Sequence, residues 1–212
     1  MEESHSGTSR RSCPKDQFID LVFSWSIQDI FNENLYKNQV EEIPESFECV
    51  DKYLGSYIYP LLEETRAELA SAMESVYKAP FAEVTSFREC KGETFFYDTK
   101  VDHWRNRHSD RGREAYRTLP GDILLISNMK PETASDLERA AWICTFACVR
   151  KISDDDESGN GCTSCNFKVR TAELIEVGDE RIETLYVVFL MNITTNKRIW
   201  NALGMRRKSE DH

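Results

Sequence analysis

Between Phe81 and Ile193 the sequence alternates six short apolar runs with Gly, Asn, Asp and Pro, and this pattern restricts the possible folds more than any other feature. The runs are rich in the β-branched and aromatic residues that favour strands. They cover residues 81–90, 93–102, 121–128, 141–152, 166–177 and 182–193. Six strands in about 110 residues, with turn residues between them, are typical of a small antiparallel barrel or sandwich.

The residues before this region repeat their apolar side chains at helical spacing instead. From Pro14, which suits the first turn of a helix, apolar residues recur every three or four positions, and this predicts one amphipathic helix to about Tyr36. A second helical stretch is predicted from about Ser46, with Pro60 either kinking it or starting a new helix. Together the two stretches predict a helical hairpin, or stalk, with charged residues on its outer side.

The change of pattern at Ala79 predicts an α+β fold, in which an N-terminal helical hairpin or stalk is followed by a small antiparallel β-barrel. We expect a disordered polar tail at residues 1–14, the stalk at 15–79 and the barrel at 80–196. Residues 197–212 are expected to begin a connector helix and to end in a polar tail.

The net charge of −10 is concentrated in the predicted stalk. Residues 16–78 hold 13 acidic residues against four basic ones, so the rest of the chain is close to neutral. An acidic protein is an unusual nucleic-acid binder, but acidity confined to one part leaves the other part able to bind. No apolar run approaches the ~20 residues that a membrane span needs, so no membrane partner is expected.

The cysteines and the N-terminal residues bear on localisation. The first 16 residues contain no apolar core of the kind that a secretory signal has. Seven cysteines is an odd number, which suits reduced thiols better than a disulfide framework. We therefore expect a nuclear or cytoplasmic protein.

The segment from Lys100 to Asp122 combines basic and aromatic residues in a way that suits nucleic acid. Arginine side chains bind phosphates through paired hydrogen bonds, and aromatic rings stack on bases. The candidate nucleic-acid-binding residues are Lys100, Trp104, Arg105, Arg107, Arg111, Arg113, Tyr116 and Arg117. The alternative is a solvated loop whose charges pair with one another, with Trp104 plugging the barrel.

The sequence contains no arrangement of residues that nominates a catalytic site. Cys162 and Cys165 have the spacing of half a zinc knuckle, but no second pair accompanies them, so no metal site is predicted. The dipeptide Gly-Lys does not occur, and a phosphate-binding loop of the G-x-x-x-x-G-K-S/T type is therefore absent. We predict no catalytic residue, no metal and no cofactor.

Five long stretches, among them FLMNITTNKRIWNALGM, resemble in order the N-terminal region of plant superfamily 1B helicases of the senataxin-like group, relatives of the nonsense-decay helicase. They are residues 18–47, 57–73, 96–127, 130–149 and 189–205. The resemblance covers roughly residues 15–205. It implies a helical stalk and a small β-barrel, which in that family packs over the first RecA-like motor domain.

In this family the helix around Trp200 leads into the ATPase motor. Here the sequence after Met205 reads RRKSEDH and supplies no phosphate-binding loop, so we do not transfer the helicase activity of the family to this chain. The resemblance therefore implies a non-catalytic, helicase-like accessory module of RNA metabolism. Its expected partner is single-stranded nucleic acid, with RNA favoured over DNA.

Two other functions are compatible with the sequence. In one, the acidic stalk is a protein-interaction module that competes for partners of full-length helicases through Trp25, Phe31 and Leu35. The same three residues would otherwise pack the hairpin together. In the other, the sequence is a fragment of an ATP-dependent helicase.

Overall fold

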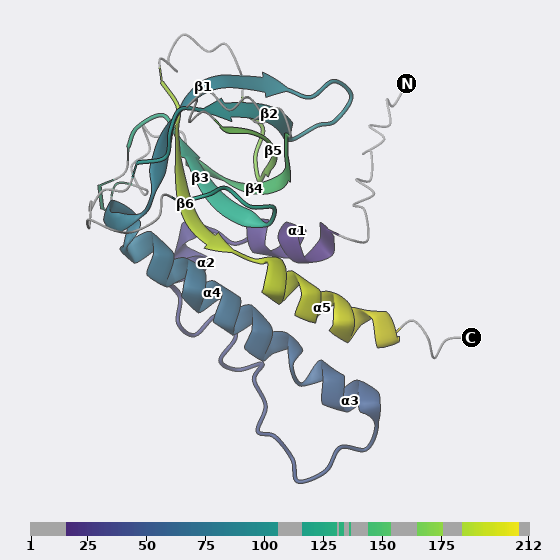
Figure 1. The fold of residues 1–212 in the computed structure, drawn as a ribbon. Coiled ribbons are helices and arrows are strands. Elements are labelled where there is room, and N and C mark those ends of the chain that lie inside the picture. Colours follow the sequence, from purple (N-terminus) through teal and green to yellow (C-terminus); the bar gives the residue numbers. More distant parts are fainter. Residues whose placement is uncertain are drawn as a thin grey trace, which may run out of the picture.

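The computed structural model describes residues 16–105, 116–130, 132–133, 136, 144–153, 165–175 and 184–207, with the backbone alone for 205–207. Within these residues a closed β-barrel lies against a group of helices (Figure 1). The strands are β1 (Phe81–Glu89), β2 (Phe96–Val101), β3 (Asp122–Ser127), β4 (Cys144–Ile152), β5 (Cys165–Thr171) and β6 (Tyr186–Asn192).

All neighbouring strands of the barrel are antiparallel, and their order is β1-β2-β5-β4-β3-β6. Each strand coincides with one of the six predicted runs, although β2, β4 and β6 begin three or four residues after the start of the run. The predicted α+β fold with an antiparallel barrel is therefore confirmed. Closure of the sheet removes the unpaired edges that an open six-stranded sheet would expose.

The barrel interior is filled by alternate side chains of the strands, which form one hydrophobic cluster. The rings of Phe87 and Tyr97 stack in it with their centres 4.4 Å apart. Tyr97 is fully buried, and its hydroxyl both donates to the Ile175 carbonyl (3.1 Å) and accepts from the Ile175 N–H (3.0 Å). The one polar atom of this ring is thus satisfied, as burial requires.

The first helical stretch consists of two short helices, α1 (Gln17–Phe23) and α2 (Ile27–Phe31). A capping box starts α2: the Asp29 N–H donates to Ser26 Oγ (3.1 Å) and the Ser26 N–H donates to Asp29 Oδ2 (2.9 Å). The prediction of one helix to about Tyr36 is therefore wrong. The hydrogen bonds at Ser26 begin a new helix where apolar periodicity alone predicted continuation.

The second helical stretch contains α3 (Val50–Gly55) and α4 (Ile58–Glu74), and a short 3₁₀ turn, η2 (Val76–Lys78), leads into β1. Pro60 lies in the first turn of α4, where its missing N–H costs nothing, so it belongs to a new helix rather than to a kink. No helix in the described part of the chain has both the length and the apolar character needed to cross a membrane.

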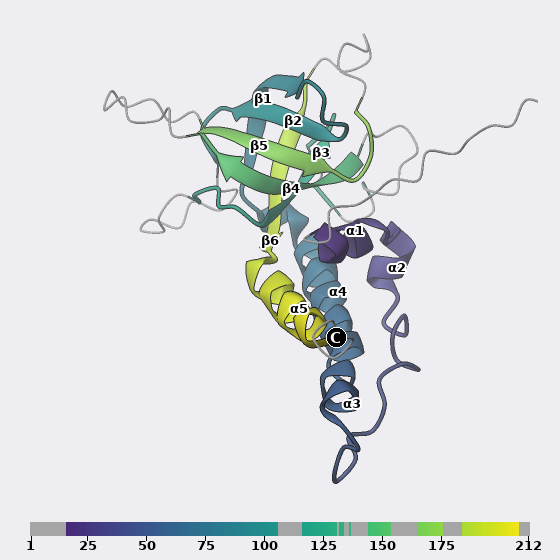
Figure 2. The same ribbon diagram turned by 90° about the vertical axis from the view of Figure 1, so that its right-hand side faces the viewer.

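A second hydrophobic cluster lies between the helices and the outer face of β3 and β6 (Figure 2). All six residues of β3 are buried. Leu124 and Ile126 belong to the interior cluster, whereas Ile123 and Leu125 belong to the cluster under the helices. A strand covered on both faces needs apolar residues at every position, and this explains the uninterrupted apolar run ILLI.

The residues that the sequence nominated for partner binding on the stalk lie in this second cluster. Trp25 is buried, and its Nε1–H donates to the Tyr36 hydroxyl at 2.7 Å. Phe31 and Leu35 are half-buried against the same cluster. These side chains therefore pack the helices together, which is the alternative that the periodicity also allowed.

Helix α5 (Thr194–Arg207) runs beside α4 (Figure 1). Between them the buried Asn196 amide donates to the buried Thr65 hydroxyl at 3.0 Å. The helix begins three residues before the predicted start of the connector. Asn192 Oδ1 accepts the Thr194 N–H at 2.9 Å and so satisfies one of the free donors at the helix start.

Gly121 connects this helix start with β3. Its N–H donates to the Val149 carbonyl (2.8 Å), and its carbonyl accepts from the Ile193 N–H (3.0 Å). Its φ is +90°, and a Cβ at this position would lie 2.2 Å from Thr194 Oγ1. Backbone conformation and close approach therefore both require glycine here.

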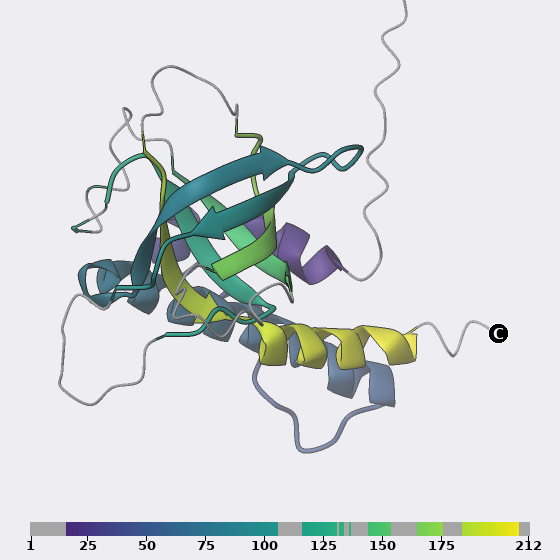
Figure 3. The ribbon, with the colours of Figure 1, turned by 45° about the horizontal axis from the view of Figure 1, so that its top comes forward.

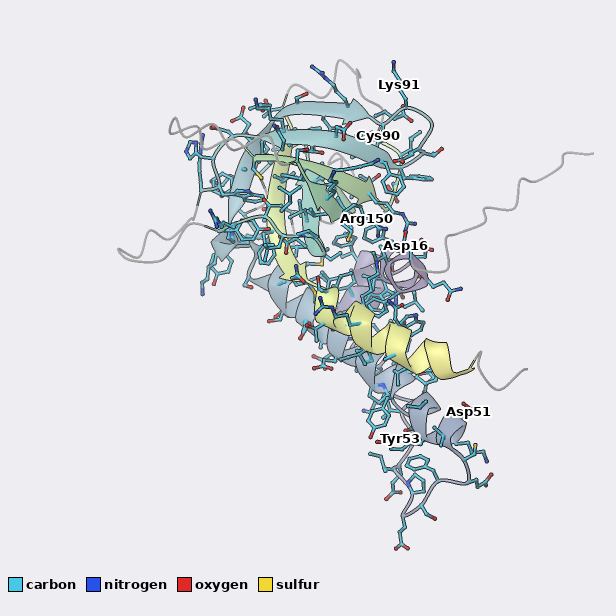
Figure 4. All side chains as sticks on the ribbon, turned by 45° about the vertical axis from the view of Figure 1, so that its right-hand side comes forward. Asp16, Asp51, Tyr53, Cys90, Lys91 and Arg150 are labelled. Carbon is cyan, nitrogen blue, oxygen red and sulfur yellow. The ribbon has the colours of Figure 1, made fainter. Side chains whose placement is uncertain are left out.

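An ion cluster at the start of α1 joins three parts of the fold, and Figure 4 shows Arg150 and Asp16 side by side at the junction of barrel and helices. Arg150 on β4 donates to both carboxylate oxygens of Asp16, at 2.8 and 3.0 Å. Lys197 on α5 lies 3.4 Å from the same carboxylate, and Arg170 on β5 pairs with Asp20 of α1. We call these five residues the junction cluster.

Candidate nucleic-acid interface

The structure describes five of the eight residues that the sequence nominated. Lys100 lies on the outer face of β2 and is exposed. Arg105 is exposed as well, and its guanidinium donates to Asp102 at 3.3 Å, while Arg117 is also exposed. The three others, Arg107, Arg111 and Arg113, lie outside the described residues.

Trp104 and Tyr116, the two nominated aromatic rings, are half-buried and contact each other with centres 4.5 Å apart. The Trp104 ring packs against the interior cluster of the barrel, and its Nε1–H donates to Thr118 Oγ1 at 2.9 Å. Tyr116 also contacts the Phe189 ring, again at 4.5 Å. Both rings thus pack against the barrel, as the alternative interpretation of this segment expected for Trp104.

The hydroxyl of Tyr116 donates to the buried carboxylate of Asp122. Burial and this hydrogen bond raise the pKa of Tyr116 far above its usual value. The carboxylate also accepts from the Leu119 N–H (2.6 Å) and from Asn192 Nδ2 (2.7 Å). These bonds fix the point at which the chain re-enters the barrel.

Replacing this phenol, in Tyr116→Phe, should lower the free energy of unfolding by about 1.5 kcal/mol, because a buried carboxylate loses one of three donors. Urea denaturation would measure the change. The control is Tyr77→Phe, at a side chain 42% exposed, where a change near zero is expected. Equal effects of the two variants would contradict the role of the hydrogen bond.

A row of charged residues crosses the outer face of four strands. Arg88 on β1 pairs in register with Asp98 on β2, Asp98 with Lys168 on β5, and Lys168 with Lys151 on β4. Lys100 lies two residues further along β2, so its side chain is on the same face. We call Arg88, Lys100, Lys151 and Lys168 the basic face. Its four-strand row spans about 14 Å at the usual spacing of strands.

The basic face lies away from the helices. In Figure 2, β1, β2, β5 and β4 follow one another down the upper body, with the helices below them, and Figure 3 shows β1 and β2 on the far side of the barrel from α4 and α5. Arg88, Lys100 and Lys151 are exposed, and Lys168 is half-buried. The helices of the described part of the chain therefore leave the basic face accessible to a ligand.

Acidic and aromatic neighbours modify this face. Lys168 forms an ion pair with Glu93, and the hydrogen bond to Glu93 raises the pKa of the lysine. Its ammonium also lies 5.3 Å from the centre of the Phe96 ring. Four cations thus face the two carboxylates of Asp98 and Glu93, with one ring beside them on which a base could stack.

Sequence reasoning found Lys100 but missed Arg88, Lys151 and Lys168. Arg88 and Lys168 each follow a buried phenylalanine, so alternation along the strand gave a signal that their side chains face outward. Lys151 follows the half-buried Arg150 at a register shift of β4, so alternation gave no such signal for it. The three cations share one row because of the order and register of the strands in the closed barrel. Alternation within a single strand specifies neither the order nor the register.

A pocket of about 380 Å³ at the start of α5 is also lined by basic residues, among them Arg150, Lys197 and Arg198. The first two already bind the Asp16 carboxylate. Burial by itself would raise the pKa of Asp16, but the hydrogen bonds and charges of Arg150 and Lys197 hold that pKa below its usual value. Because the fold itself uses these cations, we regard the basic face as the better candidate.

Burial lowers the reactivity of the two cysteines of β4. Burial raises the pKa of the Cys144 thiol to about 12 and that of Cys148 to about 11, so both are protonated at neutral pH. Cys165 is half-buried near the Thr118 hydroxyl, and Cys162 lies outside the described residues. In the described ranges, no group of three or more His, Cys, Asp or Glu side chains is placed to hold a metal ion.

The extent of this architecture agrees with a known domain family. The sequence profile of the family described as "Domain of unknown function (DUF6469)" matches residues 14–210. The chain belongs to the DUF6469 family. The DUF6469 match begins before α1 and ends beyond α5, so it includes both hydrophobic clusters and the junction cluster. A search of the curated proteins found no match. The DUF6469 description names no activity, so the resemblance to helicases stays a prediction.

Proposed function

We propose that this DUF6469 domain is a non-catalytic, helicase-like accessory module whose basic face contacts single-stranded nucleic acid. The observation that supports the proposal is the basic face, in which three of the four positions of a cross-strand row are cations, on the side of the barrel that the helices leave open. RNA is the expected partner because the sequence resembles helicases of RNA metabolism.

The geometry suits a phosphate backbone. Arg88, Lys168 and Lys151 occupy three of the four positions of the cross-strand row, whose strands are about 4.8 Å apart, and Lys100 lies on the same face of β2. The face therefore provides several cations for neighbouring phosphates. Small barrels that bind single strands combine such a groove or face with aromatic rings, and Phe96 is the ring available here. The acidic helices lie below this face in Figure 2, with α1 held to β4 and β5 through Arg150 and Arg170, and would direct the strand toward the basic face.

The proposal is tested by fluorescence anisotropy with a labelled single-stranded oligouridine and the matching DNA, each at two salt concentrations. Wild-type protein should bind RNA, with an affinity that falls steeply as salt rises, because counterions are released from the phosphates. The variant Arg88→Glu/Lys100→Glu/Lys151→Glu should bind roughly tenfold or more weakly and should show a smaller salt slope.

Two further variants locate the interface. Arg105→Glu/Arg107→Glu/Arg111→Glu tests the segment that the sequence nominated and should also weaken binding. Lys37→Glu/Lys52→Glu/Lys78→Glu makes the same change of charge on exposed residues of the helical part, and its loss should be clearly smaller. Weak binding without salt dependence, or equal losses in the basic-face and helical variants, would overturn the proposal.

A further inference from the structure

The end of the helical part that lies farthest from the barrel exposes a group of aromatic and apolar side chains. Val50, Tyr53 and Tyr57 are 50%, 43% and 42% exposed, and Phe47 is half-buried beside them. They lie on α3 and on the chain just before it and after it (Figure 1). Figure 4 shows Tyr53 at the opposite end of the molecule from Lys91 of the barrel. We call Phe47, Val50, Tyr53 and Tyr57 the aromatic tip.

The three rings of the aromatic tip hold one another in place. Phe47 contacts Tyr53 edge to face with centres 5.2 Å apart, and Tyr53 contacts Tyr57 in the same way at the same distance. The Tyr57 hydroxyl also donates to the Tyr53 hydroxyl at 3.2 Å. Since Leu54 and Ile58 of the same segment pack against the helical core, the backbone under the rings is anchored. The rings thus form an ordered surface that requires little rearrangement on binding.

The surroundings of the aromatic tip are strongly acidic. Residues 40–57 contain one basic residue, Lys52, which pairs with Glu48. Their acidic residues are Glu41, Glu42, Glu45, Glu48 and Asp51. Exposed tyrosine rings surrounded by carboxylates attract cations through two interactions. The carboxylates attract them by charge, and the electron-rich ring faces attract them by cation–π contact.

We propose that the aromatic tip is a docking surface for an Arg- or Lys-rich peptide segment of a protein partner. Charge complementarity selects this occupant: a nucleic acid or a second copy of this acidic tip would be repelled. Arginine in particular stacks its planar guanidinium on aromatic rings while pairing with carboxylates. This surface is distinct from Trp25, Phe31 and Leu35, which the helical core buries or half-buries, and the proposal does not depend on the basic face.

Fluorescence anisotropy with a labelled peptide of four Arg-Gly-Ser repeats tests this proposal on the full chain at low salt. The wild-type protein should bind the peptide, and a peptide with Glu in place of Arg should not bind. Tyr53→Ala/Tyr57→Ala should weaken binding about tenfold, because two cation–aromatic contacts are lost. Glu42→Gln/Glu45→Gln should weaken it several-fold.

The matched control is Glu64→Gln/Glu68→Gln, which removes two exposed carboxylates from α4 away from the tip and should change the affinity less than twofold. Circular dichroism establishes that each variant is folded. The variant Tyr53→Ala/Tyr57→Ala should bind oligouridine as tightly as wild type does. This measurement distinguishes a failure of the peptide-docking proposal from a failure of the proposal that the basic face binds nucleic acid. No binding of the Arg peptide to wild type, or unchanged binding by the tyrosine variant, would overturn the proposal.

Discussion

The variant Asp16→Asn should lose about 3 kcal/mol of stability in urea or thermal unfolding. The change leaves Arg150, Lys197 and Arg170 close together at the junction of α1, the barrel and α5, where Asp20 is the one carboxylate of the described residues that still pairs with them. The Asp16 side chain is 11% exposed and that of Arg150 is 26% exposed, so solvent screens the remaining charges poorly. Removing one partner of a buried ion pair has effects of this size.

The control for this prediction is Glu48→Gln, which removes the carboxylate of an exposed ion pair. Lys52 and Glu48 are 60% and 78% exposed, and such pairs contribute less than about 1 kcal/mol. If Asp16→Asn cost no more than Glu48→Gln, the junction cluster would have no special role in stability.

The effect of Asp16 should depend on pH in a defined direction. Its pKa in the folded protein lies below the ordinary value of 3.8. The carboxylate therefore stabilises the fold fully above the unfolded-state pKa, and this contribution is lost as the pH falls through the lower folded-state pKa. The difference in stability between wild type and Asp16→Asn should accordingly be constant near neutral pH and shrink below about pH 4.

The second large effect is expected for Gly121→Ala, with a loss of about 2–4 kcal/mol. An alanine at a φ of +90° is strained, and its Cβ would collide with Thr194 Oγ1 at 2.2 Å. The contact could be relieved only if the start of α5 moved. Hydrogen bonds from Thr194 to the Pro120 carbonyl and from Ile193 to the Gly121 carbonyl hold that start beside the beginning of β3. The measurement is again the free energy of unfolding in urea.

Gly55 supplies the comparison, because a Cβ there would meet nothing within 4 Å. It ends α3, so Gly55→Ala should be neutral or stabilise the protein by up to about 1 kcal/mol. A double variant, Gly121→Ala/Thr194→Ala, removes the hydroxyl that the new Cβ would meet and should recover part of the loss. Equal stability of the two glycine variants would show that the close approach is unimportant.

Much of the fold could be predicted from the sequence because alternation and apolar periodicity are local signals. The six strands follow from their apolar runs, and β3 was recognisable although it does not alternate. The break before α2 was missed, even though Ser26 and Asp29 have the spacing of a capping box, because the apolar spacing on both sides continued. The closing pair of β1 and β6 joins residues about 100 positions apart, and no local pattern specifies such a pair.

The candidate interface was less predictable, for a related reason. Lys100 was found because it lies in a dense run of charges, whereas Arg88 is the single cation of β1 and Lys151 has only Arg150 beside it in β4. Their proximity depends on strand register, and a shift by one residue would reverse the direction of each side chain. Trp104 was predicted to stack on bases because basic residues surround it in the sequence. In the structure its ring packs instead against the hydrophobic cluster of the barrel interior.

The burial of β3 on both faces has a consequence for how the molecule comes apart. Ile123 and Leu125 belong to one core and Leu124 and Ile126 to the other, so the two cores share this strand. Neither the helical half nor the barrel can lose its partner without exposing this strand to water. Two halves with such different sequences should therefore melt together, in one cooperative transition.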